Sequence, residues 1–291
     1  MKASSVDKIF GYSMLMPSML LLSALGLFPI LFVLVYSFSD FYYLSKSAPN
    51  FIWAKNYIEI FKDKYFIQAI FNTFKFMFLA VFFEIFIALV LAGLVNSLKF
   101  IANFVRSIIV LPYLMPPVTT ALIWQIMFSN NEGVINKILE IFGLLPHNWL
   151  QNPVTALYAI LIIDIWQYMP FVFLLLYAAM LNVPKDQYEA AKIDGANAFS
   201  QFIHITIPNI MPAILIAITL RVIDTFRLFD KVNILTGGGP ANSTATISQY
   251  IFEHGIKSLK IGYASAVSVI MVLVVLIFSV KYIQKQLKAE E

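Results

Sequence analysis

Residues 182–195 read NVPKDQYEAAKIDG, a polar segment that lies between two long apolar stretches. Pro184 suits the first position of a helix, and Asp186 complements the positive end of the helix dipole. Gly195 suits the left-handed residue that follows the end of a helix. The segment therefore predicts a short polar helix that ends at a glycine turn.

A second short helix is expected at 196–206, and Pro208 then marks the start of the next apolar stretch. The resulting helix–turn–helix at 182–207 has two interpretations. It can be a simple connector at a membrane surface. It can also be a docking element, in which small Ala190 and Ala191 admit another surface while Glu189 and Asp194 offer charge to a partner's Arg or Lys. The apolar side chains of the second helix share one face: Phe199, Phe202 and Ile203.

Composition places the chain in a membrane. Hydrophobic residues make up 60% of the 291 residues and charged residues only 12%, and the mean hydropathy is +0.81. Soluble domains carry about 25% charged residues, so half that share cannot cover a water-facing surface. The net charge of +4 is too small and too scattered for a nucleic-acid binder. The absence of cysteine excludes disulfides and thiolate metal sites.

Six stretches approach the length of about 20 apolar residues that a helix needs to cross a bilayer. Helices are expected because a spanning segment must satisfy its own backbone hydrogen bonds in lipid. The predicted fold is therefore an all-α integral membrane protein with one transmembrane domain at 1–291. The expected spans are 12–38, 67–95, 107–129, 154–180, 208–229 and 261–281. Prolines at 112, 116, 117, 170 and 212 predict kinks in three of these segments.

An even number of spans puts both chain ends on the same side of the membrane. With the ends inside, nine Lys or Arg residues fall in inner segments and eight in outer segments. This difference is too small for the positive-inside rule to fix the orientation.

The pattern around Glu189 resembles the EAA loop of binding-protein-dependent ABC importer permeases. The stretch EAA at 189–191 is followed by DGA at 194–196 and by Ile205-x-x-Pro208, without a gap. In that family the loop is cytoplasmic and docks into a cleft of the ATPase subunit. The resemblance therefore implies a type I importer permease fold, a cytoplasmic coupling loop at 182–207 and both termini inside a prokaryotic inner membrane. It assigns ATPase coupling to Glu189, Ala190, Ala191, Asp194 and Gly195.

Further motifs are similar to the carbohydrate branch of this family, which includes the maltose and glycerol-phosphate types. They are TGGGP at 236–240, GYASA at 262–266, Asn72-Thr73 and Leu111-Pro112. The resemblance covers about 12–285 and implies a sugar importer that works by alternating access. It also implies a second permease subunit, two ATPase subunits and an extracytoplasmic solute-binding protein as partners.

The chain contains no G-x-x-x-x-G-K-[ST] loop, so P-loop hydrolysis of ATP must take place in another subunit. No cofactor is expected in this chain, because ATP and magnesium would be bound by the ATPase partners. No catalytic set is recognisable, since there is no HExxH motif, no cysteine and no cluster of His147, His204 and His254. An enzyme is therefore not expected, and neither is a metal site.

Polar and charged side chains inside two spans suggest a substrate pathway. In span four they share one face at i, i+3 and i+7, and span five has a similar face. Hydrogen-bonding groups beside apolar or aromatic residues suit a sugar, whose hydroxyls need partners and whose ring faces pack on aromatics. The alternative is an ion-pair network, because Asp224 is three residues from Arg221 and from Arg227. Glu84 in span two is expected to be a packing or interface acid.

The resemblance places eight residues at the family's sugar-contacting positions: Asp164, Gln167, Tyr168, Phe171, Arg221, Asp224, Thr225 and Leu228. Arg221 and Asp224 stand where the maltose-type pattern has neutral groups, so a phosphorylated polyol or an acidic oligosaccharide is an alternative substrate. A self-sufficient transporter that couples protons through Asp164 or Asp224 is a further alternative.

Overall fold

The computed structural model describes residues 5–98, 101–130 and 132–287, and it describes side chains within 13–98, 101–130 and 132–277. The two chain ends, which are expected in the cytoplasm, lie outside the described residues. The described chain is helical, with one isolated bridge between Ser39 and Phe51 and no strand. It divides into two units, and each is considered separately.

The smaller unit contains residues up to Asp63 together with Ile251–Leu273. It holds α1 (Ser5–Tyr36), α2 (Lys55–Lys62), a π-helical turn (Glu253–Lys257) and the first part of α13 (Ile261–Leu287). Buried Asn56 donates hydrogen bonds to the carbonyls of Ser37 and Ser39, which fixes the turn after α1. The described side chains of α1 are strongly apolar and largely exposed, as expected for a helix that lipid covers.

The larger unit, Lys64–Tyr250 with the end of α13, is built on α3 (Lys64–Ser97), α7 (Ala156–Leu181) and α10 (Ile207–Phe226). Small residues on α3 recur every fourth position at Ala80, Ala88 and Ala92 and are fully buried, so α7 can approach closely. One apolar cluster contains Ala80, and a second contains Ala88. Glu84 lies between them on the same helical face. Glu84 is therefore held between two apolar clusters.

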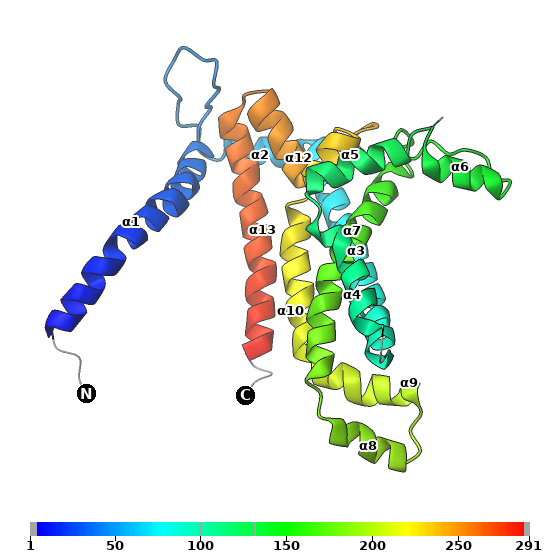
Figure 1. Cartoon of the computed structure of the whole chain (residues 1–291). Helices are drawn as coiled ribbons and strands as arrows, with labels where there is room; N and C mark the ends of the chain where they lie inside the picture. The colour runs from blue at the N-terminus through cyan, green and yellow to red at the C-terminus, as the bar shows by residue number, and fades with distance from the viewer. Residues whose placement is uncertain (1–4, 99–100, 131, 288–291) are drawn as a thin grey trace. The chain divides into compact units, whose positions relative to one another are not determined.

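The third expected span differs from a single helix. It is formed by α4 (Ala102–Val110), a 3₁₀ turn (Leu111–Leu114) and α5 (Pro117–Met127), and the axis bends by 95° at the break. Met115 and Pro116 are both extended, because a residue before proline is pushed out of the helical region and proline lacks an N–H donor. As a result α4 runs beside α7, whereas α5 runs across the end of the bundle (Figure 1).

The other five expected spans each coincide with one helix: α1, α3, α7, α10 and α13. Ser13–Tyr36, Lys64–Ser97, Ala156–Leu181 and Ala198–Phe226 are long and apolar enough to cross a membrane, and α4 with α5 is a fifth candidate as a broken span. The described apolar part of α13, Ile261–Ile277, is shorter. Short helices connect these segments: α6 (Val134–Ile141), α8 (Lys185–Ile193), α9 (Ala198–Gln201), α11 (Asp230–Leu235) and α12 (Ile247–Phe252).

The predicted helix–turn–helix at 182–207 is present with two differences. α8 begins at Lys185, so Pro184 occupies the N-cap position and not the predicted first helical position, whereas Gly195 has φ +82° after the helix end, as predicted. The second helix does not stop before Pro208. It passes through a π-helical stretch, Phe202–Thr206, into α10 as one run from Ala198 to Phe226. Pro208 is the second residue of α10 and directly follows the π-helical stretch, where the regular α-helical hydrogen-bond pattern is already interrupted.

Candidate functional site

Three helices bring opposite charges together in the middle of the larger unit. Arg221 of α10 is 2% exposed, and its Nε and Nη2 lie 2.6 and 2.9 Å from the two carboxylate oxygens of Glu84 on α3. The same Nη2 donates to Asp164 Oδ2 of α7 at 2.9 Å, and Nη1 pairs with Asp224. This forked geometry uses every face of the guanidinium, which suits arginine rather than lysine.

Lys231 at the start of α11 completes this group. It is 2% exposed and forms an ion pair with the second carboxylate oxygen of Asp164. The ring of Tyr168 lies beside both cations, with its centroid 4.3 Å from Arg221 Cζ and 4.3 Å from Lys231 Nζ. Such contacts stabilise cations through the negative face of the ring. We call Glu84, Asp164, Arg221, Asp224 and Lys231 the charged layer.

A cavity of about 280 Å³ opens beside the charged layer. Pro117 lines it, together with the segment Arg227–Lys231. Six of the eight predicted pathway residues also line it: Asp164, Tyr168, Arg221, Asp224, Thr225 and Leu228. We call this space the central cavity. Three carboxylates and three cations are among its lining residues: Asp164, Asp224, Asp230, Arg221, Arg227 and Lys231. A fourth carboxylate, Glu84, lies behind the cavity and pairs with Arg221.

Gln167 and Phe171 are not among the residues that line the central cavity. Gln167 is 1% exposed, and its Nε2 donates to the carbonyl of Met115 at 2.8 Å. This carbonyl is at the break between the 3₁₀ turn and α5, so the amide satisfies a backbone group that the proline break releases. Phe171 stacks on Tyr113 with a centroid distance of 5.5 Å.

Several lining side chains are already engaged within the protein. The hydroxyl of Thr225 donates to the carbonyl of Arg221 at 2.9 Å, and Leu228 belongs to a buried apolar cluster. Asp224 is the most accessible member of the charged layer, with a side chain that is 39% exposed, and its second oxygen lies 3.6 Å from Arg227. The predicted ion-pair network is therefore present, and its exposed edge is at Asp224.

Glu84 and Lys231 were not predicted as members of this site. Glu84 lies four residues from Ala80 and from Ala88, a spacing that turns it toward the close contact with α7. That signal in the sequence could have located it. Lys231 follows span five and reads as an ordinary loop residue, and no pattern in the sequence marks it as buried.

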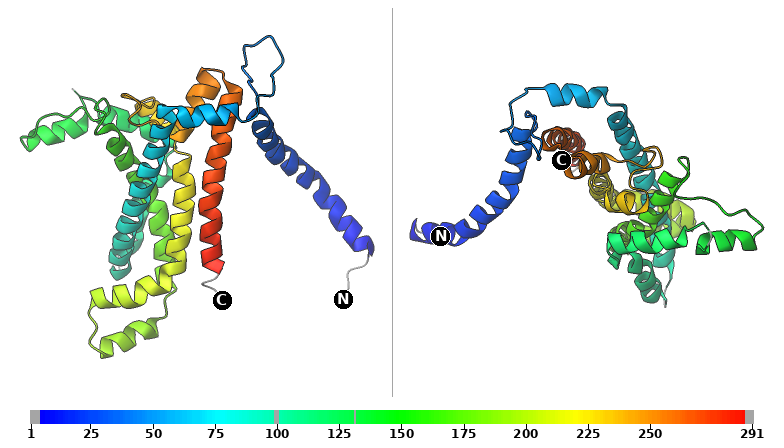
Figure 2. Two further views of the ribbon diagram at one scale, coloured as in Figure 1. Left: turned by 180° about the vertical axis from the view of Figure 1, so that it is seen from behind. Right: turned by 90° about the horizontal axis from the view of Figure 1, so that it is seen from above.

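The helix–turn–helix at 182–207, which we call the elbow, is exposed at the opposite end of the larger unit from α5 and α6 (Figures 1 and 2). Glu189, Ala190, Asp194 and Gly195 are exposed, and Ala191 is partly buried. Two large apolar side chains beside them are also open, Ile193 at 87% and Phe199 at 75% exposure. An exposed acid among small and apolar residues is a typical docking surface.

Side-chain hydrogen bonds attach α8 to the helical run that continues into α10. The hydroxyls of Tyr188 and Thr206 are 2.8 Å apart, and Asn209 Nδ2 donates to Gln187 Oε1 at 2.8 Å. Asn197 caps α9 by accepting from the backbone N–H of Ser200. The elbow is thus fixed to the helix that carries Arg221. Within the described ranges, no group of three or more His, Cys, Asp or Glu side chains is arranged to hold a metal ion.

Comparison with known proteins assigns the family. Residues 84–289 match the family described as binding-protein-dependent transport system inner membrane component. The chain belongs to this family. Its match begins at Glu84 and includes the central cavity and the elbow, and membership makes the chain a multi-pass membrane protein that acts as a transport component.

Curated relatives are permease proteins. The trehalose/maltose transport system permease protein MalF of Thermococcus litoralis is 36% identical over 234 residues, which cover 80% of this chain and 79% of that protein. The sulfoquinovosyl glycerol transport system permease protein SmoG of Agrobacterium fabrum is 32% identical and covers 91% of this chain and 86% of its own length.

The fold is that of a type I ABC importer permease. The crystal structure of a bacterial ABC transporter involved in the import of the acidic polysaccharide alginate aligns with a TM-score of 0.85 at 22% identity. The alignment covers 97% of this chain and 96% of the other. The predicted fold class is thereby confirmed.

Proposed function

We propose that this chain is a permease subunit of an ATP-driven carbohydrate importer that works by alternating access. Family membership supports the transport role, and the relatives named for trehalose, maltose and arabino-oligosaccharides support the sugar class. The proposed assembly contains a second permease subunit, two ATPase subunits that bind ATP and magnesium, and an extracytoplasmic solute-binding protein. One chain then forms half of the pathway.

The elbow is the proposed docking site for an ATPase subunit. Exposed Glu189 offers a negative charge to a partner Arg or Lys, and Ala190 beside it leaves room for close approach. Docking places the elbow in the cytoplasm and both chain ends on the same side. The proposed location is a prokaryotic inner membrane.

The observation that carries this mechanism is the unbroken helical run from Ala198 to Phe226. It begins in the elbow and ends beside the central cavity, so a rigid displacement of α9 tilts α10 and moves Arg221. Because Arg221 is bonded to Glu84 and Asp164, the displacement is transmitted to α3 and α7 as well. Closure of the ATPase pair then opens the central cavity toward the outside, and ATPase reopening returns it inward.

The charges favour a neutral substrate over an anionic one. Arg221 is surrounded by three carboxylates, and the central cavity is lined by as many carboxylates as cations, three of each, with Glu84 buried behind them. An acidic oligosaccharide or a phosphorylated polyol would therefore meet no unneutralised positive charge there. Asp164 is held by two cations, so proton coupling through this residue has no support in the geometry.

Reconstitution tests the proposal. The assembled transporter is placed in proteoliposomes with the sugar-loaded binding protein outside and ATP inside, and uptake of labelled maltose and trehalose is measured. We expect uptake that requires both ATP and binding protein. Uptake driven by a proton gradient without ATPase subunits would contradict the proposal.

Proteolysis tests the orientation. Right-side-out vesicles should protect Lys185 and Lys192 of the elbow from trypsin, and inside-out vesicles should expose them. Cleavage at these residues in right-side-out vesicles would show that the elbow faces outward, which would exclude docking to a cytoplasmic ATPase.

A further inference from the structure

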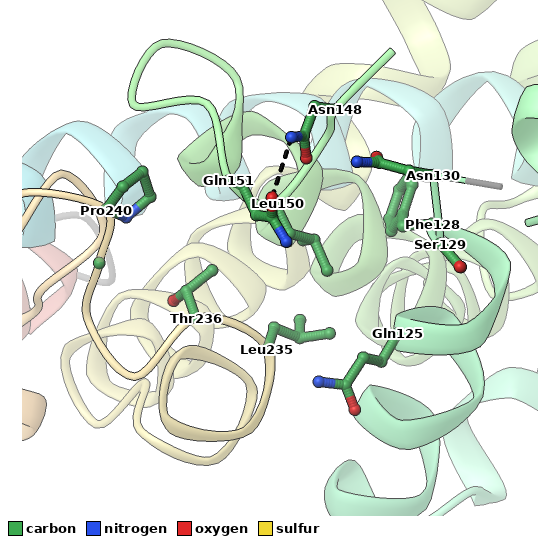
Figure 3. A pocket seen from close by; sticks show the side chains of 11 residues that line it. Gln125, Phe128, Ser129, Asn130, Asn148, Leu150, Gln151, Leu235, Thr236 and Pro240 are labelled. Carbon is green, nitrogen blue, oxygen red and sulfur yellow. Dashed lines mark hydrogen bonds between the residues drawn. The ribbon is translucent and has the colours of Figure 1, made fainter. Parts of the chain in front are cut away.

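A second cavity, of about 540 Å³, lies in the larger unit at the end opposite the elbow. Three segments that are distant in sequence surround it (Figure 3). They are the end of α5 with the following turn, the loop before α7, and the end of α11 with the glycine-rich loop. Its volume is within the range of about 300–1,000 Å³ that is usual for small-molecule sites. We call it the amide cavity.

None of the side chains that line the amide cavity is charged. Four are amides, two are hydroxyls, and apolar groups supply much of the rest. Amides donate and accept hydrogen bonds at the same time, which matches sugar hydroxyls, while apolar surfaces pack on the C–H faces of a sugar ring. The polar side chains are Gln125, Ser129, Asn130, Asn148, Gln151 and Thr236.

One buried side chain joins two of the three walls. Asn136 of α6 is 2% exposed and does not line the cavity itself. Its Nδ2 donates to the carbonyls of Asn130 at 3.2 Å and His147 at 3.1 Å, and its Oδ1 accepts from Trp149 Nε1 at 2.9 Å. A buried amide that satisfies both of its ends in this way fixes the positions of the segments that it links.

The third wall is fixed by a similar set of contacts. The hydroxyl of Thr244 donates to the carbonyl of Gly239 at 2.8 Å and lies 2.7 Å from the hydroxyl of Thr236. Gln125 Nε2 donates to the carbonyl of Ile234 at 3.3 Å and so links α5 to α11. The amide cavity is thus preformed, which lowers the entropy cost of binding a ligand.

Hydrogen-bonding capacity remains at the open side of the cavity. Asn148 Nδ2 donates to Gln151 Oε1 at 3.0 Å, as the dashed line in Figure 3 shows. This contact orients both amides and leaves the nitrogen of Gln151 as a donor and the oxygen of Asn148 as an acceptor for a ligand. Adjacent hydroxyls of a sugar ring present the same pair.

We propose that the amide cavity is a binding subsite for a neutral sugar ring, separate from the central cavity. The proposal rests on the proposed function for its placement on the extracytoplasmic side, where the substrate arrives. A ring leaving the binding protein is held there by Asn148 and Gln151 before it reaches the central cavity. Without a cation among its lining residues, the site does not attract an acidic sugar.

The absence of native cysteine allows a direct test. Gln151→Cys places one thiol at the cavity, and the assembled transporter, with partner thiols removed, is treated with a membrane-impermeant thiol reagent. Increasing concentrations of maltose or maltotriose should slow modification about three- to tenfold once the sugar reaches about two to nine times its dissociation constant, because the rate falls with the fraction of occupied sites. Val154→Cys is the matched control, because Val154 is exposed in the same loop and does not line the cavity. Its modification rate should not change.

Three results would overturn the proposal: equal rates for Gln151→Cys with and without sugar, stronger protection by an acidic oligosaccharide, or full protection by sugar-free binding protein alone. The last result would identify the cavity as a contact for a protein loop. Transport is measured on the same preparations. Absence of any carbohydrate transport by the unmodified complex would contradict the proposed function, whereas normal transport with no protection would contradict only the subsite.

Discussion

The charged layer and the elbow use charged residues in opposite ways. In the charged layer, Arg221 and Lys231 are almost fully buried, and each lies against at least one carboxylate. In the elbow, Glu189 and Asp194 are exposed, and none of the ion pairs in the described part of the chain includes them. The first group holds three helices together, and the second leaves its charge accessible at the surface of the chain.

This difference shows why a charge inside a membrane span is weak evidence for a substrate contact. Burying an ion is costly unless a partner compensates it, so neighbouring helices supply partners first. A substrate can use only what remains, which here is the exposed edge at Asp224. The two groups also predict different effects of substitutions. Changes in the charged layer should lower the thermal stability of the protein, and changes in the elbow should lower the transport driven by ATP hydrolysis.

The largest effect is expected for Arg221→Met. It leaves Glu84 buried without its partner, and the loss of one member of a buried pair costs about 3–5 kcal/mol. The thermal unfolding temperature of the purified complex and the amount of folded protein should both fall sharply.

A double variant refines this prediction. Glu84→Gln combined with Arg221→Met removes both charges, so the loss should be smaller than the sum of the two single losses. Additive losses would show that the pair contributes no coupling energy and would contradict the assigned role of the layer.

The next largest effect is expected for Glu189→Lys. Reversing the charge at the docking surface should reduce ATP-driven uptake at least about tenfold, equivalent to about 1.4 kcal/mol, while thermal stability stays unchanged because the residue is exposed. Uptake and melting temperature are measured together in proteoliposomes. Glu140→Lys, the same change on exposed α6, is the control. Full uptake by Glu189→Lys would exclude docking at this residue.

A smaller effect is expected for Asp224→Ala. Its side chain lines the central cavity and is partly exposed, so initial uptake rates should fall a few-fold or change in preference among sugars. The loss of stability should be well below that of Arg221→Met, since Glu84 and Asp164 still neutralise the guanidinium. Unchanged uptake with a lower melting temperature would instead assign Asp224 to the ion-pair network alone.

The smallest effect is expected for Tyr188→Phe, which removes the hydroxyl contact with Thr206. A partly exposed hydrogen bond contributes about 0.5 kcal/mol, the lower end of the usual range, so the number of sugars carried per ATP hydrolysed should fall by about twofold. Exposed Tyr42→Phe serves as the control. An unchanged ratio of transport to hydrolysis would mean that this contact does not couple α8 to the helical run that continues into α10.

The predicted elements were most accurate where local signals are strong. Gly195 was placed in the left-handed region after α8, and five spans follow single helices. The prediction missed the break at Met115, since proline patterns indicate a kink but not a bend of 95°. It also ended the second helix of the elbow before Pro208. A proline near the start of a helix is compatible with a new helix or with the continuation of an earlier one, and the sequence does not distinguish the two.

Residues of the central cavity were only partly predictable. Periodicity placed Asp164 and Arg221 on inward faces, which requires only the helical repeat. It could not distinguish Gln167, which bonds to Met115, from a residue that lines the cavity, because the carbonyl it contacts is 52 positions away in sequence. The role of Gln167 depends on where α5 leaves the bundle.

The sequence by itself determined the membrane class, the helical segments and the exposed acid of the elbow, because hydropathy, helical periodicity and capping act over a few neighbouring residues. Only the tertiary structure decided which charges neutralise one another. Arg221 meets Glu84 137 positions earlier and Asp164 57 positions earlier, and such a meeting depends on how closely α3, α7 and α10 approach. A short-range pattern can predict that a buried charge needs a partner, but the packing of the helices selects that partner.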